Sequence, residues 1–299
     1  MSEGRRFLLL VNPSAGGGRA RELVPRIEAA MTGAGLEHRS VLTTGLEHGR
    51  AEARKAAAAG ETPVVVSGDG LIGQIGGALA GTGATMGLIC GGRGNDLARV
   101  LGIPDEVEAA VGLLGAGETR EIDVGEVNGH RFLGIASCGF DSDANRIANE
   151  AKLVRGRLVY AYAALRALAG WKDATFTLDL DGERSELRGY GVAVANSRAY
   201  GGGMYVAPDA ELDDGLFDVI SLRQTGKLRF LTGILPKVFD GKHVEQPEIG
   251  VRRAAEVSIA ADRPFAVYAD GDHIADLPAT VRLLPRALRV IVPRPAPAT

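Results

Sequence analysis

The chain has 299 residues, which is enough for one large domain or two ordinary ones with a substantial core. Its net charge of −3 gives no overall attraction to nucleic acid or anionic lipid, so we expect no nucleic-acid partner. No apolar run approaches the ~20 residues that span a membrane, and Cys90 and Cys138 have neither metal-ligand nor redox spacing. The composition therefore predicts a cytoplasmic protein in a reducing compartment.

Residues 5–120 alternate between strand and helix patterns. Apolar, β-branched runs predict strands at residues 7–11, 38–43, 64–67 and 85–90. Amphipathic or Ala-rich runs predict helices at residues 19–32, 48–59, 74–80, 95–101 and 107–116. This βα alternation predicts a parallel sheet with helices on both faces, and such sheets bind ligands at the carboxyl ends of their strands.

From about Arg120 the pattern becomes mostly β. Predicted strands lie at residues 121–127, 131–137, 175–180, 189–195, 216–222, 257–260, 265–269 and 288–292, and helical patterns are limited to 142–168 and 228–239. We therefore expect an α/β domain at residues 1–122 and a mostly β sandwich at 123–286. The sequence leaves open whether the last strand, 287–295, returns to the first domain.

Three glycine-rich turns each follow a predicted strand of the first domain. They occupy residues 12–18, 67–70 and 91–96, and the second reads Ser67-Gly68-Asp69-Gly70. Glycine lets backbone N–H groups approach an anion, and three such turns on one sheet edge favour a phosphate site. Neither common nucleotide fingerprint, G-x-x-x-x-G-K-[ST] or G-x-G-x-x-G, fits these turns. Taken alone, the Gly-Asp-Gly segment is as consistent with an ordinary tight turn as with a phosphate site.

Two acidic segments occur in the second half. Residues 209–216 contain four carboxylates but do not match the EF-hand pattern, so a solvated turn and a Mg²⁺ site are both open. Asp270-Gly271-Asp272 lies between two predicted strands. Asp-Gly is a common hairpin signal, and the alternative is that Asp272 serves as a general base.

Five segments then combine into a larger pattern. They are Leu8-Leu9-Leu10-Val11-Asn12-Pro13-Ser14-Ala15-Gly16; Ser67-Gly68-Asp69-Gly70; Gly94-Asn95-Asp96-Leu97-Ala98-Arg99 with Leu101-Gly102-Ile103-Pro104; Tyr200-Gly201-Gly202-Gly203-Met204 through Leu212-Asp213-Asp214-Gly215-Leu216; and Asp270-Gly271-Asp272. In this order they resemble the motifs of the diacylglycerol kinase catalytic family, which includes bacterial lipid kinases and sphingosine kinases. The resemblance covers nearly the whole chain and implies a nucleotide-binding α/β domain followed by a β-sandwich domain.

The resemblance also implies roles for individual residues. The implied ATP-binding residues are Asn12, Pro13, Ser14, Ala15, Gly16, Thr43, Gly68, Asp69, Gly70, Leu71, Gln74, Arg93 and Asn95. Asp69 would organise phosphate and Mg²⁺, and Asp96 and Asp123 would join a magnesium–water network. A structural Mg²⁺ would be held by the Asp214 side chain and the Glu211 and Leu216 main-chain carbonyls. Asp272 would be the catalytic general base.

The chain departs from the family pattern at four of these positions. Leu71 stands for Thr, Gln74 for Glu, Arg93 for Thr and Asp272 for Glu. Arg93 can bind phosphate as a planar fork or can pair with Asp69 or Asp96, and the sequence does not decide between the two.

The function implied is that of an ATP- and Mg²⁺-dependent lipid kinase, a transferase of phospholipid metabolism that converts diacylglycerol to phosphatidic acid. The alternatives are a kinase for a sphingoid base or other lipid alcohol, and a homologue that binds nucleotide or lipid with weakened catalysis. A lipid acceptor implies work at the inner membrane surface. The basic-apolar stretch with Lys152, Arg155 and Arg157 would touch that surface or be the solvated face of a helix. The sequence does not decide whether the protein forms a homodimer.

Overall fold

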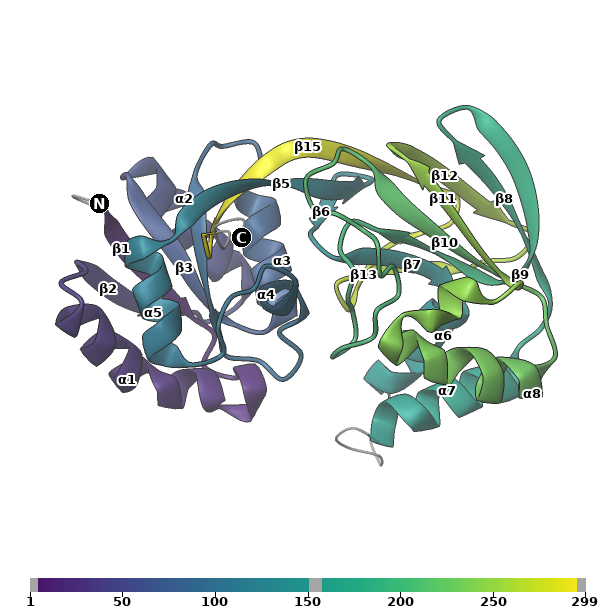
Figure 1. Cartoon of the computed structure of the whole chain (residues 1–299), viewed down its shortest axis with the longest axis horizontal. Helices are drawn as coiled ribbons and strands as arrows, with labels where there is room; N and C mark the ends of the chain where they lie inside the picture. Colours follow the sequence, from purple (N-terminus) through teal and green to yellow (C-terminus); the bar gives the residue numbers. More distant parts are fainter. Residues whose placement is uncertain (1–4, 151–157, 295–299) are drawn as a thin grey trace, which may run out of the picture. The chain divides into compact units, whose positions relative to one another are not determined.

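A computed structural model of the chain describes residues 5–150 and 158–294 (Figure 1). The described chain forms two compact units. The first runs to Val124 and adds Arg131–Leu133 and the chain from Leu284 onward. The second consists of Gly125–His130 and Gly134–Leu283. None of the helices in the described ranges has the length and apolar character needed to cross a membrane.

The first unit is built on a parallel sheet whose strands are adjacent in the order β2, β1, β3, β4, β15. Their bounds are β1 Arg6–Val11, β2 His38–Leu42, β3 Glu61–Ser67, β4 Thr85–Cys90 and β15 Ala279–Val292. Only the end of β15 belongs here, since Arg289 and Val290 pair with β4. The predicted α/β architecture is confirmed.

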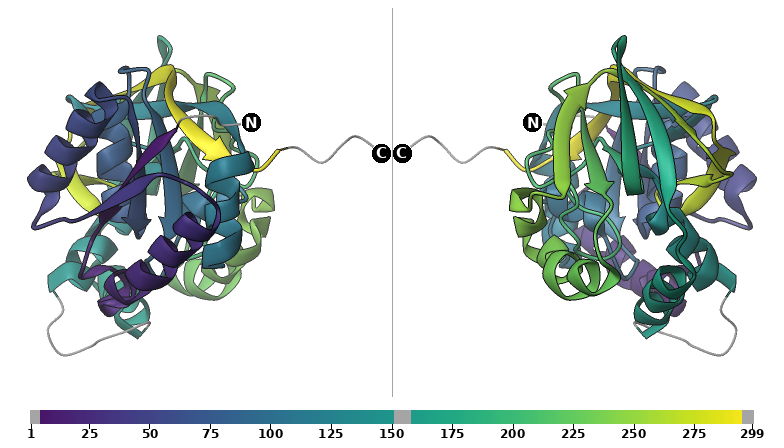
Figure 2. Two further views of the ribbon diagram at one scale, coloured as in Figure 1. Left: turned by 90° about the vertical axis from the view of Figure 1, so that its left-hand side faces the viewer. Right: turned by 90° about the vertical axis from the view of Figure 1, so that its right-hand side faces the viewer.

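Helices cover both faces of this sheet because its central strands are apolar on both sides. One core cluster joins Phe7, Leu9 and Val11 of β1 to α1 (Arg19–Gly33) and α5 (Val107–Ala116). These two helices lie together on one face (Figure 2). On β1 the intervening residues, Leu8 and Leu10, are equally buried, and α2 (Leu46–Ala58) contacts β1, β3 and α3.

Helix α3 begins at Asp69, five residues before the predicted start at Gln74, and ends at Leu79. Asp69 and Gly70 were expected in a loop but are helical, and Gly73, Gly76 and Gly77 are buried in the helix. A Cβ on Gly76 would lie 2.5 Å from Leu133 Cδ1, and one on Gly77 would lie 3.0 Å from Arg131 Cβ. The glycines therefore allow the 131–133 segment to pack closely on α3. In the Gly-Asp-Gly motif, Gly68 is the N-cap of α3, and Asp69 and Gly70 begin its first turn.

The second unit is mainly antiparallel. Its strands are β7 Ile135–Gly139, β8 Ala174–Leu180, β9 Glu183–Ala195, β10 Phe217–Arg223, β11 Ile249–Ala254, β12 Glu256–Ala261, β13 Ala266–Ala269 and β14 Asp272–Asp276. The start of β15 pairs with β12, whereas β5 (Glu118–Val127) pairs with β15 and with β6 (His130–Phe132). The single strand predicted at 131–137 is wrong, because β6 and β7 are separate strands.

Helices of the second unit pack around an aromatic core. They are α6 Phe140–Glu150, α7 Leu158–Gly170 and α8 Lys227–Arg229, followed by a π-helical turn at Phe230–Ile234 and 3₁₀ turns at Leu235–Asp240 and Lys242–Glu245. Tyr190 is stacked between Trp171 and Phe230, with ring centroids 5.4 and 4.8 Å away. Such pairs add roughly 0.5–1.5 kcal/mol each beyond the burial of their area. The residues Lys152, Arg155 and Arg157 lie outside the described ranges.

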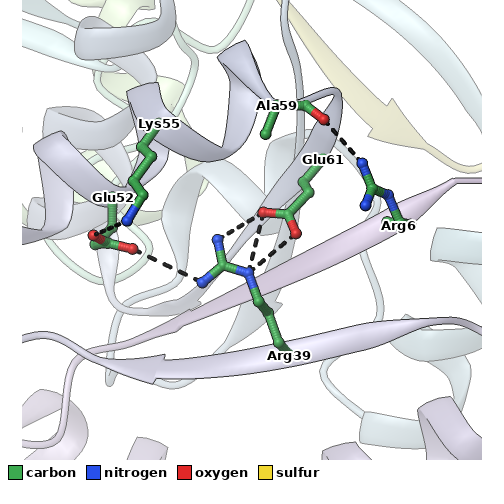
Figure 3. Close-up of polar contacts among 6 residues, drawn as sticks. All are labelled: Arg6, Arg39, Glu52, Lys55, Ala59 and Glu61. Atoms are coloured by element: carbon green, nitrogen blue, oxygen red, sulfur yellow. Dashed lines mark hydrogen bonds and ion pairs between the residues drawn. The ribbon is translucent and has the colours of Figure 1, made fainter.

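An ion-pair network ties the edge strand β2 to its neighbours (Figure 3). The residues drawn are Arg6, Arg39, Glu52, Lys55, Ala59 and Glu61. Arg39 of β2 donates to both carboxylate oxygens of Glu61, with its shortest contact at 2.6 Å, and lies 3.8 Å from Glu52. These hydrogen bonds hold the pKa of the Glu61 carboxyl below its usual range. The charged form of Glu61 therefore stabilises the fold.

The Glu61→Gln variant should lower the free energy of unfolding at pH 7 by about 0.5–1 kcal/mol, because Gln is neutral and keeps only one acceptor oxygen for the three hydrogen bonds that Arg39 donates. The folded pKa is depressed, so this stabilisation is present above the unfolded pKa and disappears as pH falls through the folded pKa. Urea denaturation of both proteins at pH 7 and near pH 3 measures the difference. Glu47→Gln is the control, because that side chain is 81% exposed and should contribute little. An equal effect at both pH values would contradict the assignment.

Candidate active site

Three glycine-rich turns meet at one edge of the parallel sheet. They follow β1, β3 and β4, which are adjacent parallel strands, so their carboxyl ends lie side by side. The Gly91 N–H donates to the Ser67 carbonyl at 2.9 Å, which continues the β3–β4 pairing into the turns. The structure thus places the three predicted loops together, as the strand order requires.

The turns touch through their main chains, and glycine makes this contact possible. A Cβ on Gly92 would lie 2.4 Å from the Cα of Gly68, and one on Gly16 would lie 2.5 Å from the Gly91 carbonyl oxygen. Both distances are far below van der Waals contact. Gly91 and Gly92 are absent from the residues implied by the resemblance, although their place in the third turn was a readable signal.

Polar side chains in the turns hold the backbone in shape. The Asn12 side-chain oxygen accepts hydrogen bonds from the Ser14 N–H at 3.1 Å and the Ser14 hydroxyl at 2.8 Å. Asn95 has a left-handed φ of 51°, and its side-chain oxygen accepts from the Gly92 N–H at 3.1 Å. The buried Thr43 hydroxyl donates to the Val11 carbonyl at 3.2 Å. These side chains therefore hold the loops in shape.

Asp69 occupies the first turn of α3 and carries charge into this region. Its Oδ1 accepts from the Leu97 N–H at 3.1 Å, at the start of α4 (Asp96–Val100). Burial, together with the nearby Asp96 carboxylate, raises the pKa of Asp69. Asp96 itself pairs with Arg99 at 2.5 Å. A cation arriving with a ligand would relieve the repulsion between the two carboxylates.

Two further residues of the predicted nucleotide site, Gln74 and Leu71, lie near α2, and a third, Arg93, lies near the first turn. Gln74 accepts a short hydrogen bond from the Arg50 guanidinium of α2. Leu71 Cδ1 lies 3.6 Å from the position of a Cβ on Gly49, also in α2. Arg93 extends over the first turn, and its Nη2 lies 3.3 Å from the position of a Cβ on Gly17.

Asp123 is fully buried in β5. Its Oδ1 accepts from the Arg286 N–H at 2.7 Å, where Arg286 has a left-handed φ of 50°. Through this hydrogen bond, Asp123 stabilises the backbone at Arg286 within the first unit.

The Asp214 carboxylate implied for a structural Mg²⁺ has protein partners in this structure. Asp214 Oδ1 accepts from the Leu216 N–H at 3.0 Å, and Oδ2 forms a short ion pair with Arg253. Arg253 also lies 3.8 Å from the buried Asp218, its cross-strand partner on β10. A guanidinium therefore already serves as the cation for two carboxylates of this acidic region, Asp214 and Asp218. Across the described ranges, three or more His, Cys, Asp or Glu side chains are nowhere grouped to hold a metal ion.

Asp272 lies at the first position of β14 and is exposed. It pairs across the ladder with Ala269, so Asp270 and Gly271 form a two-residue hairpin turn with φ values of 51° and 91°. Both left-handed residues match a type I′ turn. Asp270 Oδ1 accepts from the Gly134 N–H at 2.9 Å and anchors the hairpin to the strand that precedes α6. The turn thus fixes the backbone from which Asp272 projects.

Comparison with known proteins identifies the family. Residues 6–127 match the model of the diacylglycerol kinase catalytic domain, and residues 134–292 match the YegS C-terminal NAD kinase beta sandwich-like domain. A diacylglycerol kinase from Mycobacterium tuberculosis is 35% identical over 298 residues, covering 95% of this chain and 94% of that relative. The chain belongs to the diacylglycerol kinase catalytic family.

Other members of the family agree over the full length. A diacylglycerol kinase from Bacillus subtilis is 27% identical, with 97% of each chain covered. A crystal structure of a diacylglycerol kinase from Bacillus anthracis superposes with a TM-score of 0.73 at 22% identity, covering 100% of both chains. These likenesses confirm the predicted fold, an α/β domain followed by a β-sandwich.

The Gly92→Ala variant should abolish or strongly weaken nucleotide binding, because its Cβ would force the second and third turns apart. Equilibrium binding of a fluorescent ATP analogue measures the effect. Gly112→Ala, in α5, is the control, since a Cβ there meets nothing within 4 Å and helical Ala is favoured over Gly by up to about 1 kcal/mol. Wild-type affinity in Gly92→Ala would show that the close contact of the turns is dispensable.

Removing Arg253 should expose a dependence on divalent cation that the native chain lacks. Without nucleotide, we expect EDTA and Mg²⁺ to give the same thermal midpoint for the native chain. Arg253→Met should lose about 1–2 kcal/mol, because Asp214 and the buried Asp218 lose their cation, and Mg²⁺ should restore part of it. Arg252→Met is the control, as its partner Glu183 is 74% exposed. Mg²⁺-dependent stabilisation of the native chain would contradict this prediction.

Proposed function

We propose that this chain transfers the terminal phosphoryl group of ATP to a lipid hydroxyl, with diacylglycerol as the acceptor and phosphatidic acid as the product. The observation that carries the proposal is the meeting of three glycine turns at the carboxyl edge of the sheet. The names of relatives that match 94% or more of their length support the acceptor class.

The phosphate chain would bind to main-chain groups of the three turns. Gly68 is the N-cap of the 11-residue helix α3, so the free N–H groups and positive end of that helix lie beside the turns. Backbone donors in a fixed loop need no rearrangement to meet an anion, which is the arrangement that phosphoryl transfer requires. The catalytic contribution would therefore be mainly positioning and charge stabilisation.

Asp69 and Asp96 are the residues that would hold a Mg²⁺ ion accompanying ATP. Their mutual repulsion and the presence of two carboxylates fit Mg²⁺, which usually takes one or two carboxylates and completes its shell with phosphate and water. The ion would supply neutralising charge to the phosphates. The protein contributes the positions of the two carboxylates, fixed by the Leu97 N–H and by Arg99.

Asp272 would accept the proton of the acceptor hydroxyl. As the hydroxyl oxygen bonds to the terminal phosphorus, the bond to the ADP leaving group breaks and the hydroxyl proton passes to the Asp272 carboxylate. The proton then leaves to water, which restores the carboxylate. The exposed position of Asp272 at the start of β14 gives it access to an external substrate.

The proposal is tested by transfer of labelled phosphate from ATP to vesicle-borne diacylglycerol, sphingosine, phosphatidylglycerol and undecaprenol. We expect diacylglycerol to be the preferred acceptor. Asp272→Asn should reduce turnover by about 10²–10⁴-fold, the usual contribution of a general base, while ATP binding stays unchanged. Asp272→Glu keeps the carboxylate and should retain substantial activity.

Three outcomes would contradict the proposal in different ways. Transfer to sphingosine but not to diacylglycerol would replace the acceptor and keep the lipid kinase. Full activity of Asp272→Asn would remove the base assignment. Absence of transfer to every lipid by a folded, ATP-binding chain would overturn the kinase function itself.

A further inference from the structure

Arg93 is the one basic residue carried by the three turns. Residues 12–18, 67–70 and 91–96 contain three charged groups, the carboxylates Asp69 and Asp96 and the single cation Arg93. A loop built from backbone N–H groups alone offers partial charges, whereas a guanidinium offers a full positive charge and a planar pair of donors. The placement of Arg93 therefore matters for anything anionic that enters the turns.

The Arg93 guanidinium extends from the third turn to the first. Its Nη2 lies 3.3 Å from the position that a Cβ on Gly17 would take, so a side chain there would crowd it. Gly17 has a φ of 77°, a conformation that favours glycine. The first turn thus leaves room for the guanidinium at the point where the loops meet.

The base of the Arg93 side chain is fixed while its charged end is free. Gly92 on one side donates to the Asn95 side chain, and Gly91 donates to the Ser67 carbonyl. Arg93 itself is exposed, and among residues 5–150 and 158–294 its guanidinium makes neither a hydrogen bond nor an ion pair. An anchored backbone with an uncommitted cation is the arrangement expected of a ligand-binding arginine.

The two carboxylates that could have paired with Arg93 have other partners. Asp96 forms its ion pair with Arg99, which also donates to the Gly94 carbonyl at 2.8 Å. Asp69 accepts from the Leu97 N–H. The structure therefore favours the phosphate-binding alternative for Arg93 over the internal ion pair.

We infer that Arg93 binds the phosphate chain of the nucleotide as a bidentate clamp across the first and third turns. This inference rests on the proposed nucleotide site and names the side chain that gives that site its positive charge. The contact is to non-bridging phosphate oxygens, through two parallel N–H···O hydrogen bonds. The residue recognises the number of phosphates and not the base or the sugar.

The test measures binding without turnover. A fluorescent ATP analogue is displaced by ATP, ADP, inorganic tripolyphosphate and adenosine, each with EDTA and with Mg²⁺, from the native chain, Arg93→Gln, Arg93→Lys and Arg21→Gln. Arg93→Gln should weaken ATP and tripolyphosphate by about 10- to 100-fold, with the larger effect in EDTA, and leave adenosine unchanged. Arg93→Lys should fall between, because it keeps the charge and loses the fork. Arg21→Gln removes the same charge from an exposed position in α1 and should match the native chain.

Each other result overturns the inference. Native affinity for tripolyphosphate in Arg93→Gln would make Arg93 a solvated surface residue. Equal weakening of adenosine and ATP would give it a structural role in the turn. Failure of the proposed function looks different: a native chain that binds tripolyphosphate through Arg93 and transfers phosphate to no lipid would keep the clamp and lose the kinase.

Discussion

The contact between Gly68 and Gly92 is the constraint on which the rest of the first unit depends. Adjacent parallel strands bring the ends of β3 and β4 within one strand spacing, about 4.8 Å. The turns that follow must pass each other at that spacing, which leaves no room for a side chain at Gly92, since a Cβ there would lie 2.4 Å from the Cα of Gly68. Gly68 is also the N-cap of α3, so the same contact fixes where the helix begins. The start of the helix and the third turn are therefore set by one main-chain approach.

The three turns contact one another through their main chains, and their polar side chains stabilise that main chain by hydrogen bonds. The side-chain oxygens of Asn12 and Asn95 accept hydrogen bonds from N–H groups of their own turns, and the Thr43 hydroxyl donates a hydrogen bond to the end of β1. Two charged groups of the turns, Asp69 and Arg93, differ in kind. Asp69 is half-buried with a raised pKa, whereas Arg93 is exposed and unpaired among the described residues. Hydrogen bonds within the turns therefore fix the shape of the site, and its net charge changes when an anion and its counter-ion bind.

Sequence reasoning located the parts of the fold that local chemistry determines. Strand β4 and helix α5 have the predicted bounds, because an apolar run or an amphipathic period ends at glycine or a polar cluster. The predicted Asp270-Gly271 hairpin is present. Strands β11 and β14 were not predicted, since Ile249–Ala254 and Asp272–Asp276 are short and rich in charge. Their pairing is fixed by neighbouring strands, not by their own pattern.

The same limit applies to contacts between distant residues. Asp214 and Arg253 are 39 positions apart, and the acidic segment alone suggested a metal ion because its cation lies on another strand. The register of β10 against β11 places Arg253 opposite Asp218 and within reach of Asp214. A ligand set inferred from a motif therefore has to be checked against the cations that the sheet brings to it.

The departures from the family pattern acquire different meanings once their surroundings are known. Leu71 packs against Gly49, and Gln74 bonds to Arg50, so both substitutions adjust the contact between α2 and α3. Arg93 instead adds a charge where the turns converge. At positions 71 and 74 the family pattern has the hydroxyl of Thr and the carboxylate of Glu, whereas this chain has a Leu and a Gln that contact α2. At position 93 the family pattern has a neutral Thr, whereas this chain has the arginine inferred to bind phosphate. Of the three substitutions, only that of Arg93 changes the charge of the turns themselves.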